Sequence, residues 1–155
     1  MYAHTIAIGK NTGAGLVTIY RYDAARHQWP QTQVIYPTNP VNWKDFGQAV
    51  ALNGRWLFIG APSLFSPGSV YIARRDTGVY TMKYELPKPP ASVGNSFGVR
   101  LVADGNRLMV FDKYWDSYFI TPKATFLYDL CAFPSIRGQE KDVFCQGDSI
   151  HYEAA

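Results

Sequence analysis

The chain is poor in charge, in cysteine and in helical periodicity. Only 17% of its 155 residues are charged and two are cysteine, whereas 47% are hydrophobic and 15% aromatic. This composition excludes a disordered tail, which needs low hydrophobicity and high charge. Apolar residues nowhere recur at a 3.6-residue period over more than one turn, so we expect strands and turns rather than helices.

Signals for membranes and nucleic acids are also absent. No apolar run approaches the length that spans a bilayer, and residues 1–5 do not open a secretory signal. The net charge of +3 comes from scattered basic residues with no basic stripe, so we expect no nucleic-acid binding. We expect a mature or excised segment, or a chain that reaches its destination by another route.

No arrangement of residues that carries catalysis is visible. The chain has no Gly-x-Ser-x-Gly elbow, no phosphate-binding glycine loop before a helix and no Cys/His pairing. His4, His27 and His151 lie far apart, and none has a Cys, Asp or Glu at metal-ligand spacing. We therefore predict a protein that is not an enzyme and holds no cofactor.

The two cysteines, Cys131 and Cys145, lie near the C-terminal end of the sequence. In an oxidising compartment they could close a short disulfide loop. Two cysteines make no framework, however, so two unpaired, half-buried thiols are the alternative.

What the chain does have is a repeated β-hairpin pattern, clearest in residues 45–62. Small and apolar residues alternate up to Leu52, Asn53-Gly54 suits a type I′ turn, and an apolar run follows. Gly60-Ala61-Pro62 then ends the second strand, because proline cannot donate to a β-ladder.

The same pattern recurs 51 positions later. The repeated residues are Phe46 and Phe97, Gly47 and Gly98, and Gly54 and Gly105. Upstream, residues 15–21 match residues 68–74 at an offset of 53. The length differences fall in turns, which is what a repeated sheet tolerates.

These residues resemble the FG-GAP repeat of integrin alpha-chain β-propellers and related extracellular proteins. Residues 46–95 match well, residues 97–130 carry Val110-Phe111-Asp112 where Gly-Ala-Pro would fall, and residues 5–45 match without the opening strand. The resemblance implies an all-β fold of about three four-stranded antiparallel blades, which is an incomplete propeller, in an extracellular, particle-surface or cell-surface setting.

We expect blades at residues 1–45, 46–95 and 96–130, followed by an extension at residues 131–155. The expected strands are Thr5 to Gly9, Leu16 to Tyr22, Trp29 to Tyr36, Gln48 to Leu52, Arg55 to Ile59, Ser69 to Arg74, Val79 to Leu86, Val99 to Ala103, Arg107 to Phe111 and Thr125 to Leu130. Residues 141–146 and 149–152 predict one more hairpin. It completes the third blade, begins a fourth, or donates the strand that the first blade lacks.

Integrin-type blades often carry an Asp-x-Asp-x-Asp-Gly calcium loop after Gly-Ala-Pro. The corresponding residues here, 10–14 and 63–67, include no carboxylate. Asp112 and Asp116 are the only nearby pair in the third blade and are too few for a hard cation, so we predict no metal site.

The expected loop at residues 112–123 is the best candidate for binding. Its candidate binding residues are Asp112, Tyr114, Trp115, Asp116 and Tyr118. Aromatic rings among carboxylates suit protein contacts or stacking against sugars. The alternative is that Trp115 and Phe119 pack between neighbouring blades.

The sequence thus predicts a non-catalytic binding, adhesion or scaffold module that presents loops to a protein partner, without membrane insertion. The alternatives are a carbohydrate-binding propeller assembled from several blades and an accessory domain of a larger extracellular enzyme.

About three blades do not close a propeller, so we expect an uncovered apolar face at each end. The residues expected there are Ile6, Ile8, Val17 and Ile19 at one end and Leu108, Val110, Phe126 and Tyr128 at the other. Either other copies of the chain or further blades of a larger protein would cover them. We favour the larger protein, because the chain begins inside a repeat.

Overall fold

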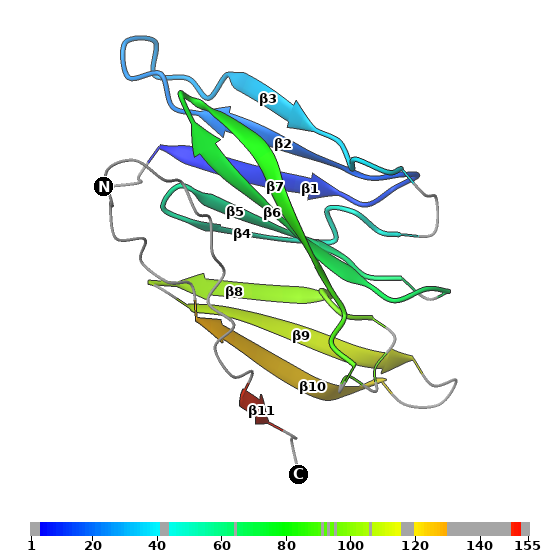
Figure 1. The fold of residues 1–155 in the computed structure, drawn as a ribbon. Helices are drawn as coiled ribbons and strands as arrows, with labels where there is room; N and C mark the ends of the chain where they lie inside the picture. The colour runs from blue at the N-terminus through cyan, green and yellow to red at the C-terminus, as the bar shows by residue number, and fades with distance from the viewer. Residues whose placement is uncertain are drawn as a thin grey trace.

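The computed structural model describes residues 4–40, 44–63, 65–90, 92, 94, 96–105, 107–115, 120–129 and 150–152. Within these residues the chain forms eleven strands and no helix, and the strands make three antiparallel sheets. The expected all-β fold class is therefore confirmed. The sheets lie one above another, with the first at the top of Figure 1 and the third at the bottom.

Each sheet follows the chain order of its strands. The first sheet has β1 (Thr5–Lys10), β2 (Leu16–Arg21) and β3 (Gln31–Ile35). The middle sheet has β4 (Ala49–Asn53), β5 (Trp56–Ala61), β6 (Ser69–Asp76) and β7 (Val79–Pro87). The third sheet has β8 (Arg100–Asp104), β9 (Arg107–Trp115), β10 (Ile120–Asp129) and β11 (Ile150–Tyr152).

Two apolar cores hold the three sheets together, and the middle sheet contributes to both. Leu57 and Ile59 of β5 face the first sheet, where they pack with Val17 and Ile19. Phe58, between them in sequence, packs in the core shared with the third sheet. Because side chains alternate along a strand, a strand between two sheets must be apolar on both faces. Fully burying each such side chain stabilises the fold by about 1.5–3 kcal/mol.

The repeated Phe-Gly dipeptide forms a tight turn before the first strand of a repeat. The Gln48 N–H donates to the Asp45 carbonyl at 3.0 Å, and Gly47 has a φ of +87°. In the next repeat the Val99 N–H donates to the Ser96 carbonyl at 3.1 Å, and Gly98 has a φ of +90°. A type II turn requires positive φ at its third residue, which explains the glycine.

Each Phe-Gly turn rests on two glycines of the preceding sheet. A β carbon built at Gly9 would overlap the Gly47 carbonyl oxygen, and one at Gly15 would overlap that of Phe46. The next junction repeats this arrangement. Gly60 lies against the Gly98 carbonyl and Gly68 against that of Phe97. We call each such contact a Phe-Gly junction. It gives a steric reason for the repeated glycines, because only a residue without a side chain allows this approach.

The turn chemistry expected for the first hairpin was wrong. Asn53 pairs with Trp56, so the loop is Gly54-Arg55, and only Gly54 has positive φ, at 63°. That pattern fits a type II′ turn. The type I′ pattern occurs instead at Thr77-Gly78, where φ is 43° and 102°.

The two matching hairpins lie at the same rim of the sheets. The side-chain amide of Asn53 donates to the carbonyl of Gly105, which is at the turn between β8 and β9.

The expected long loop at residues 112–123 was also wrong. Strand β9 continues to Trp115 and β10 begins at Ile120, so residues 112–115 and 120–123 lie in strands. The described residues of this segment are paired between β9 and β10, with a register shift between Pro122 and Ala124.

At the C-terminal end, β11 pairs with β10 and so contributes a fourth strand to the third sheet. Cys131, Cys145 and residues 141–146 lie outside the described residues.

The expected end faces need a partial correction. Val17, Ile19, Leu108, Val110 and Phe126 are all buried between sheets. In the described strands of the first and third sheets, the large hydrophobic side chains that are exposed are Ile6 (41%), Ile8 (53%) and Val102 (54%). Register explains the difference, because Ile6 and Ile8 alternate with Ala7, which packs against the core, and therefore point away from it.

Candidate functional site

The candidate residues near position 112 do not form a described surface. Tyr114 and Trp115 lie in β9, where they pair with Thr121 and Ile120. Asp116 and Tyr118 lie outside the described residues. Asp112 is fully buried, so a partner cannot reach its carboxylate.

Asp112 instead anchors the segment before Phe97. Its Oδ1 accepts a hydrogen bond from the Ser96 N–H at 3.0 Å, and its Oδ2 accepts one from the Ser92 hydroxyl. A β carbon at Gly94 would overlap the carboxylate, so the chain passes directly over it. A buried carboxylate is tolerated only when donors surround it in this way.

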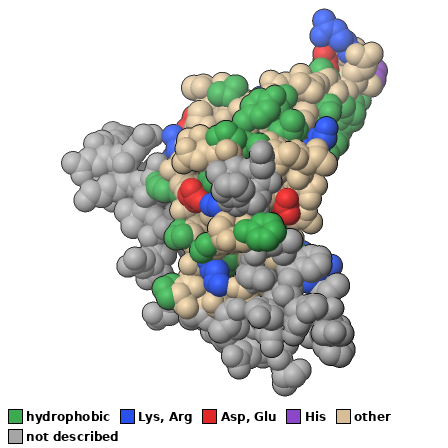
Figure 2. Space-filling model, turned by 90° about the vertical axis from the view of Figure 1, so that its right-hand side faces the viewer, with side chains coloured by type: hydrophobic (Ala, Val, Ile, Leu, Met, Phe, Trp, Pro, Cys, Tyr) green, Lys and Arg blue, Asp and Glu red, His purple; other side chains and the backbone are tan. Residues whose placement is uncertain are grey.

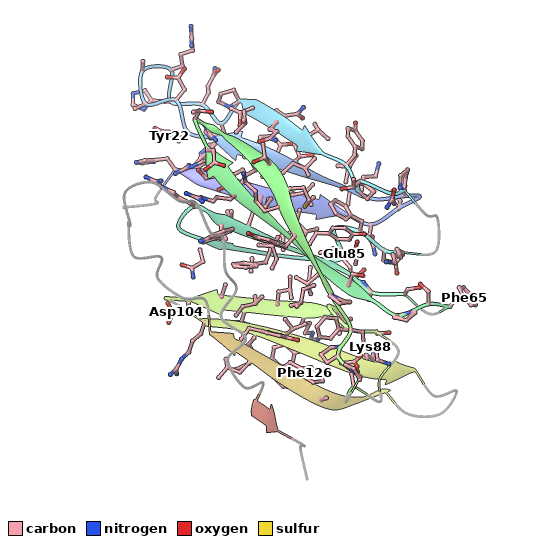
Figure 3. All side chains as sticks on the ribbon, viewed as in Figure 1. Tyr22, Phe65, Glu85, Lys88, Asp104 and Phe126 are labelled. Carbon is pink, nitrogen blue, oxygen red and sulfur yellow. The ribbon has the colours of Figure 1, made fainter. Side chains whose placement is uncertain are left out.

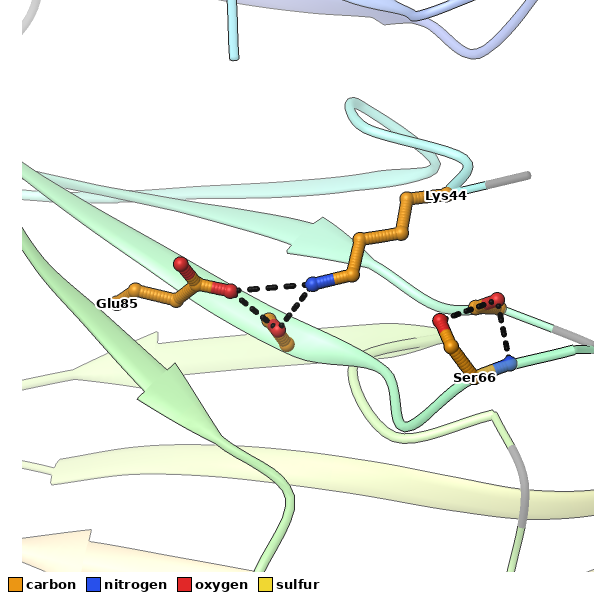
Figure 4. A network of polar contacts seen from close by, with 5 residues as sticks. Lys44, Ser66 and Glu85 are labelled. Carbon is orange, nitrogen blue, oxygen red and sulfur yellow. Dashed lines mark hydrogen bonds and ion pairs between the residues drawn. The ribbon is translucent and has the colours of Figure 1, made fainter. Parts of the chain in front are cut away.

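A second polar cluster joins Lys44, Ser69 and Glu85 (Figure 4). Lys44 Nζ donates to Ser69 Oγ at 3.1 Å and lies 3.2 Å from Glu85 Oε1. Ser69 Oγ donates to the same carboxylate oxygen at 2.6 Å. The cluster thereby ties the segment before Phe46 to strands β6 and β7.

The charges of this cluster match one another. Burial raises the pKa of Glu85, but hydrogen bonds from Ser69 and Lys44, the Lys44 charge and a bond from Tyr71 outweigh it, so the net pKa falls below 4.5. Burial, together with the Glu85 charge, raises the pKa of Tyr71 to about 12. Glu85 is therefore an anion and Tyr71 a neutral donor at neutral pH.

This arrangement does not suit nucleophilic catalysis. A serine activated by a lysine must give its proton to that lysine, whereas Lys44 Nζ donates to Ser69 Oγ and forms an ion pair with Glu85. The Ser69 side chain is also buried, at 3% exposure of the residue, and its proton is directed to a weakly basic carboxylate. The geometry supports a structural bridge.

The loop between β5 and β6 is organised by a hydroxyl group. Ser63 Oγ accepts a hydrogen bond from the N–H of Phe65 at 3.3 Å. It also accepts one from the N–H of Ser66 at 3.1 Å (Figure 4). In the part of the chain that the structure describes, no group of three or more His, Cys, Asp or Glu residues could hold a metal ion. Phe65 projects from this loop with 86% of its surface exposed.

A group of ring-bearing side chains lies together at the β2–β3 hairpin. His4, Tyr22, His27 and Trp29 make it up, and we call it the hairpin cluster. The Tyr22 ring stacks on His4 with centroids 5.6 Å apart and lies 5.2 Å from Trp29. Its hydroxyl is 3.0 Å from His27 Nδ1. Tyr22 is half-buried, whereas the other three residues are exposed.

The hairpin that carries this cluster is rigidly built. Asp23 Oδ1 accepts hydrogen bonds from the N–H groups of Ala25 and Arg26, and its other oxygen lies 2.8 Å from the Arg26 guanidinium. The hydrogen bond from the Arg26 side chain, followed by that from its N–H, lowers the pKa of Asp23. His27 closes the loop with a φ of 52°, in the left-handed region where histidine is enriched among non-glycine residues.

The hairpin stands clear of the rest of the molecule. It is the highest feature of Figure 1, and the corresponding projection in Figure 2 carries basic, acidic and histidine side chains. Figure 3 shows Tyr22 and Phe65 at opposite ends of the sheets.

The hairpin cluster was not predicted from the sequence, because the three histidines lie far apart along the chain. Tyr22, His27 and Trp29 are close in sequence, but His4 joins them only because the Tyr22 N–H donates to the His4 carbonyl at 3.1 Å. The grouping of Tyr22, His27 and Trp29 around one turn was the available signal.

No family model, no curated protein and no solved structure matches this chain. Among the described residues there is also no helix of the length and hydropathy needed to span a bilayer.

Proposed function

We propose that this chain is a non-catalytic binding module of FG-GAP-like propeller blades that contacts a protein partner through the hairpin cluster. The group of four ring-bearing side chains at a projecting hairpin, three of which are exposed, carries the proposal. A module of this kind would act at the surface of a cell or a particle.

The blade interpretation is supported by the repeated junction. Successive sheets meet through Phe46-Gly47 and Phe97-Gly98 in the same way, each turn resting on paired glycines. Strand β4 contacts both β1 and β8, so the inner edges of the sheets follow one another. A fan of twisted sheets with adjacent inner strands is the packing of a propeller.

The hairpin cluster has the properties of an interaction anchor. Trp29 is 41% exposed and offers a large apolar area. Tyr22 is already held by two rings and by its hydroxyl contact with His27. A side chain that is ordered before binding loses little entropy on association, and tryptophan and tyrosine are enriched among residues that dominate interface energies.

Two substitutions test this assignment without disturbing the core. Trp29→Ala removes the exposed ring. His27→Gly removes the imidazole and suits the positive φ of that residue. Phe65→Ala is the matched control, because Phe65 is an even more exposed aromatic side chain at the opposite end of the sheets.

The measurement is binding of the purified chain to an array of extracellular proteins, followed by titration of each ligand that is retained. We expect Trp29→Ala to weaken the affinity at least about tenfold, since a central aromatic anchor contributes 2 kcal/mol or more. His27→Gly should weaken it less, and Phe65→Ala should leave it unchanged. Loss of binding with Phe65→Ala alone would place the contact surface elsewhere.

A carbohydrate ligand is the second candidate, and the pairing of Tyr22 and Trp29 is the observation that favours it. Their centroids are 5.2 Å apart with ring planes at 48°, which gives two faces for stacking against a sugar. A glycan array separates the two functions. If the chain binds a glycan, loses that binding in Trp29→Ala and retains no protein ligand, then carbohydrate binding is its function and protein binding is not.

A further inference from the structure

The third sheet lacks the glycines on which a further Phe-Gly turn would rest. The Gly47 N–H donates to the Gly60 carbonyl at 3.0 Å, and the Gly98 N–H donates to the Phe111 carbonyl at 3.1 Å. Phe111 therefore occupies the position of Gly60, and neither β9 nor β10 contains a glycine. A blade that carried another Phe-Gly turn would meet a phenylalanine ring at this point.

The outer face of the third sheet nevertheless keeps the apolar character of a junction. Val102 pairs with Met109, and Met109 pairs with Leu127, so the three form a row across β8, β9 and β10. The corresponding row of the middle sheet is Ala51, Phe58 and Ile72, which packs in the core beneath the third sheet. In the third sheet Val102 is 54% exposed.

The free face of the first sheet has complementary features. Ile6 and Ile8 occupy the positions of Leu57 and Ile59, which are fully buried in the middle sheet. In the middle sheet the Phe46 ring contacts Tyr71, with centroids 5.3 Å apart. The first sheet has Thr18 at the position of Tyr71, and no Phe-Gly turn of the described residues covers it.

We propose that the outer face of the third sheet docks against the free face of the first sheet in a second copy of this chain. The Phe111 ring would then lie over Thr18, in the space that the Phe46 ring fills over Tyr71. Among the described residues no turn covers the face of the first sheet, and β9 and β10 of the third sheet contain no glycine that would receive one. Two copies joined in this way at both ends make a closed ring of six sheets, within the range of four to eight that propellers adopt.

This arrangement rests on the blade interpretation but does not involve the hairpin cluster. Its failure would leave the binding assay of the hairpin cluster untouched, so the two proposals can be separated.

The test is the mass of the full chain in solution, measured by native mass spectrometry and sedimentation at rising concentration. We expect a dimer. Ile8→Lys and Val102→Lys each add a charge at an exposed position, one on each face, and each should give a folded monomer with a cooperative melting transition whose midpoint does not depend on concentration. Phe65→Lys adds the same charge on an exposed loop and should remain dimeric. If either face variant fails to fold, Ile6→Lys or Thr125→Lys replaces it.

Mixing the two variants identifies a head-to-tail contact. In a mixed dimer both lysines fall in one interface and the other interface is unaltered, so the mixture should regain dimers that neither variant forms alone. Phe111→Gly should raise the dissociation constant about tenfold or more by removing the buried ring. A monomeric wild-type chain would overturn the proposal, as would a dimer that only one of the two lysine variants disrupts.

Discussion

Asp112 and Ala61 occupy equivalent positions in two repeats. In both repeats a backbone N–H just before the Phe-Gly turn needs an acceptor, but the acceptor differs. In the middle sheet the Asp45 N–H donates to the Pro62 carbonyl at 2.9 Å. In the third sheet the corresponding N–H, that of Ser96, donates to the Asp112 carboxylate. A carboxylate that appeared suited to a partner in the sequence is therefore a fixed part of the fold.

The first prediction concerns this carboxylate. Asp112→Ala leaves the Ser96 N–H without its acceptor in a buried site and should lower the free energy of unfolding by about 1–3 kcal/mol. Asp112→Asn keeps one acceptor oxygen and should cost less. Urea unfolding measures both. Asp104→Ala, at an exposed position, is the control and should change the value by less than about 0.5 kcal/mol. Equal losses for Asp112→Ala and Asp104→Ala would contradict this account.

The second prediction concerns the acid stability of the Glu85 cluster. The folded-state pKa of Glu85 lies below 4.5, so its ionised form stabilises the fold above that pH. This contribution disappears as the pH falls through the folded-state pKa. The melting temperature of Glu85→Gln should therefore lie below that of the wild type at neutral pH, and the gap should close in acid. The gap will be modest, because Glu85 is 40% exposed. If the difference in melting temperature between the wild type and Glu85→Gln widened in acid, ionised Glu85 would not be the stabilising form.

At the scale of strands, the first and middle sheets are joined by polar contacts as well as by their core. The Gln33 side chain accepts a hydrogen bond from the Tyr80 N–H at 2.8 Å and donates to the Tyr80 carbonyl at 2.7 Å. The amide thus pairs with the backbone of β7 as a neighbouring strand would.

The third prediction follows from this pairing. Gln33→Ala should speed hydrogen exchange of the Tyr80 amide selectively, because that N–H loses its acceptor. Gln33→Glu keeps an acceptor and should preserve much of the protection. Gln31→Ala, an exposed residue on the same strand, controls for general destabilisation. Unchanged exchange at Tyr80 in Gln33→Ala would show that the contact is not maintained in solution.

Strand positions in the first two sheets could be predicted because alternating residues and glycine turns are local signals. The limits of β9 and β10 could not, because Asp112 is compatible with a strand only when a distant segment supplies its donors. The hairpin cluster depended on register in the same way, since pairing between β1 and β2 brings His4 to Tyr22. Contacts between segments far apart in sequence leave no local pattern.

At the scale of the whole molecule, one steric device joins the sheets twice. Phe46-Gly47 and Phe97-Gly98 rest on glycines of the sheet before them, and each phenylalanine is buried. The third sheet ends this series at Phe111. Repetition in the sequence therefore corresponds to repetition of contacts between sheets, and the position where it stops marks a different kind of surface.

The repeated junction is the central claim, and equilibrium unfolding of four glycine variants tests it most directly. Gly9→Ala and Gly60→Ala place a β carbon against a backbone carbonyl that cannot move aside, so the overlap should cost about 3 kcal/mol or more, the upper end of the range for overpacking. Gly13 and Gly105 have open space around them, with φ of +66° and +52°. Alanine there should cost only the strain of a left-handed residue, about 1–2 kcal/mol.

The account predicts that Gly9→Ala and Gly60→Ala destabilise the chain by similar amounts, and by clearly more than Gly13→Ala and Gly105→Ala. Similar losses at all four positions, or a large loss at only one of Gly9 and Gly60, would contradict the claim that two equivalent junctions join the sheets.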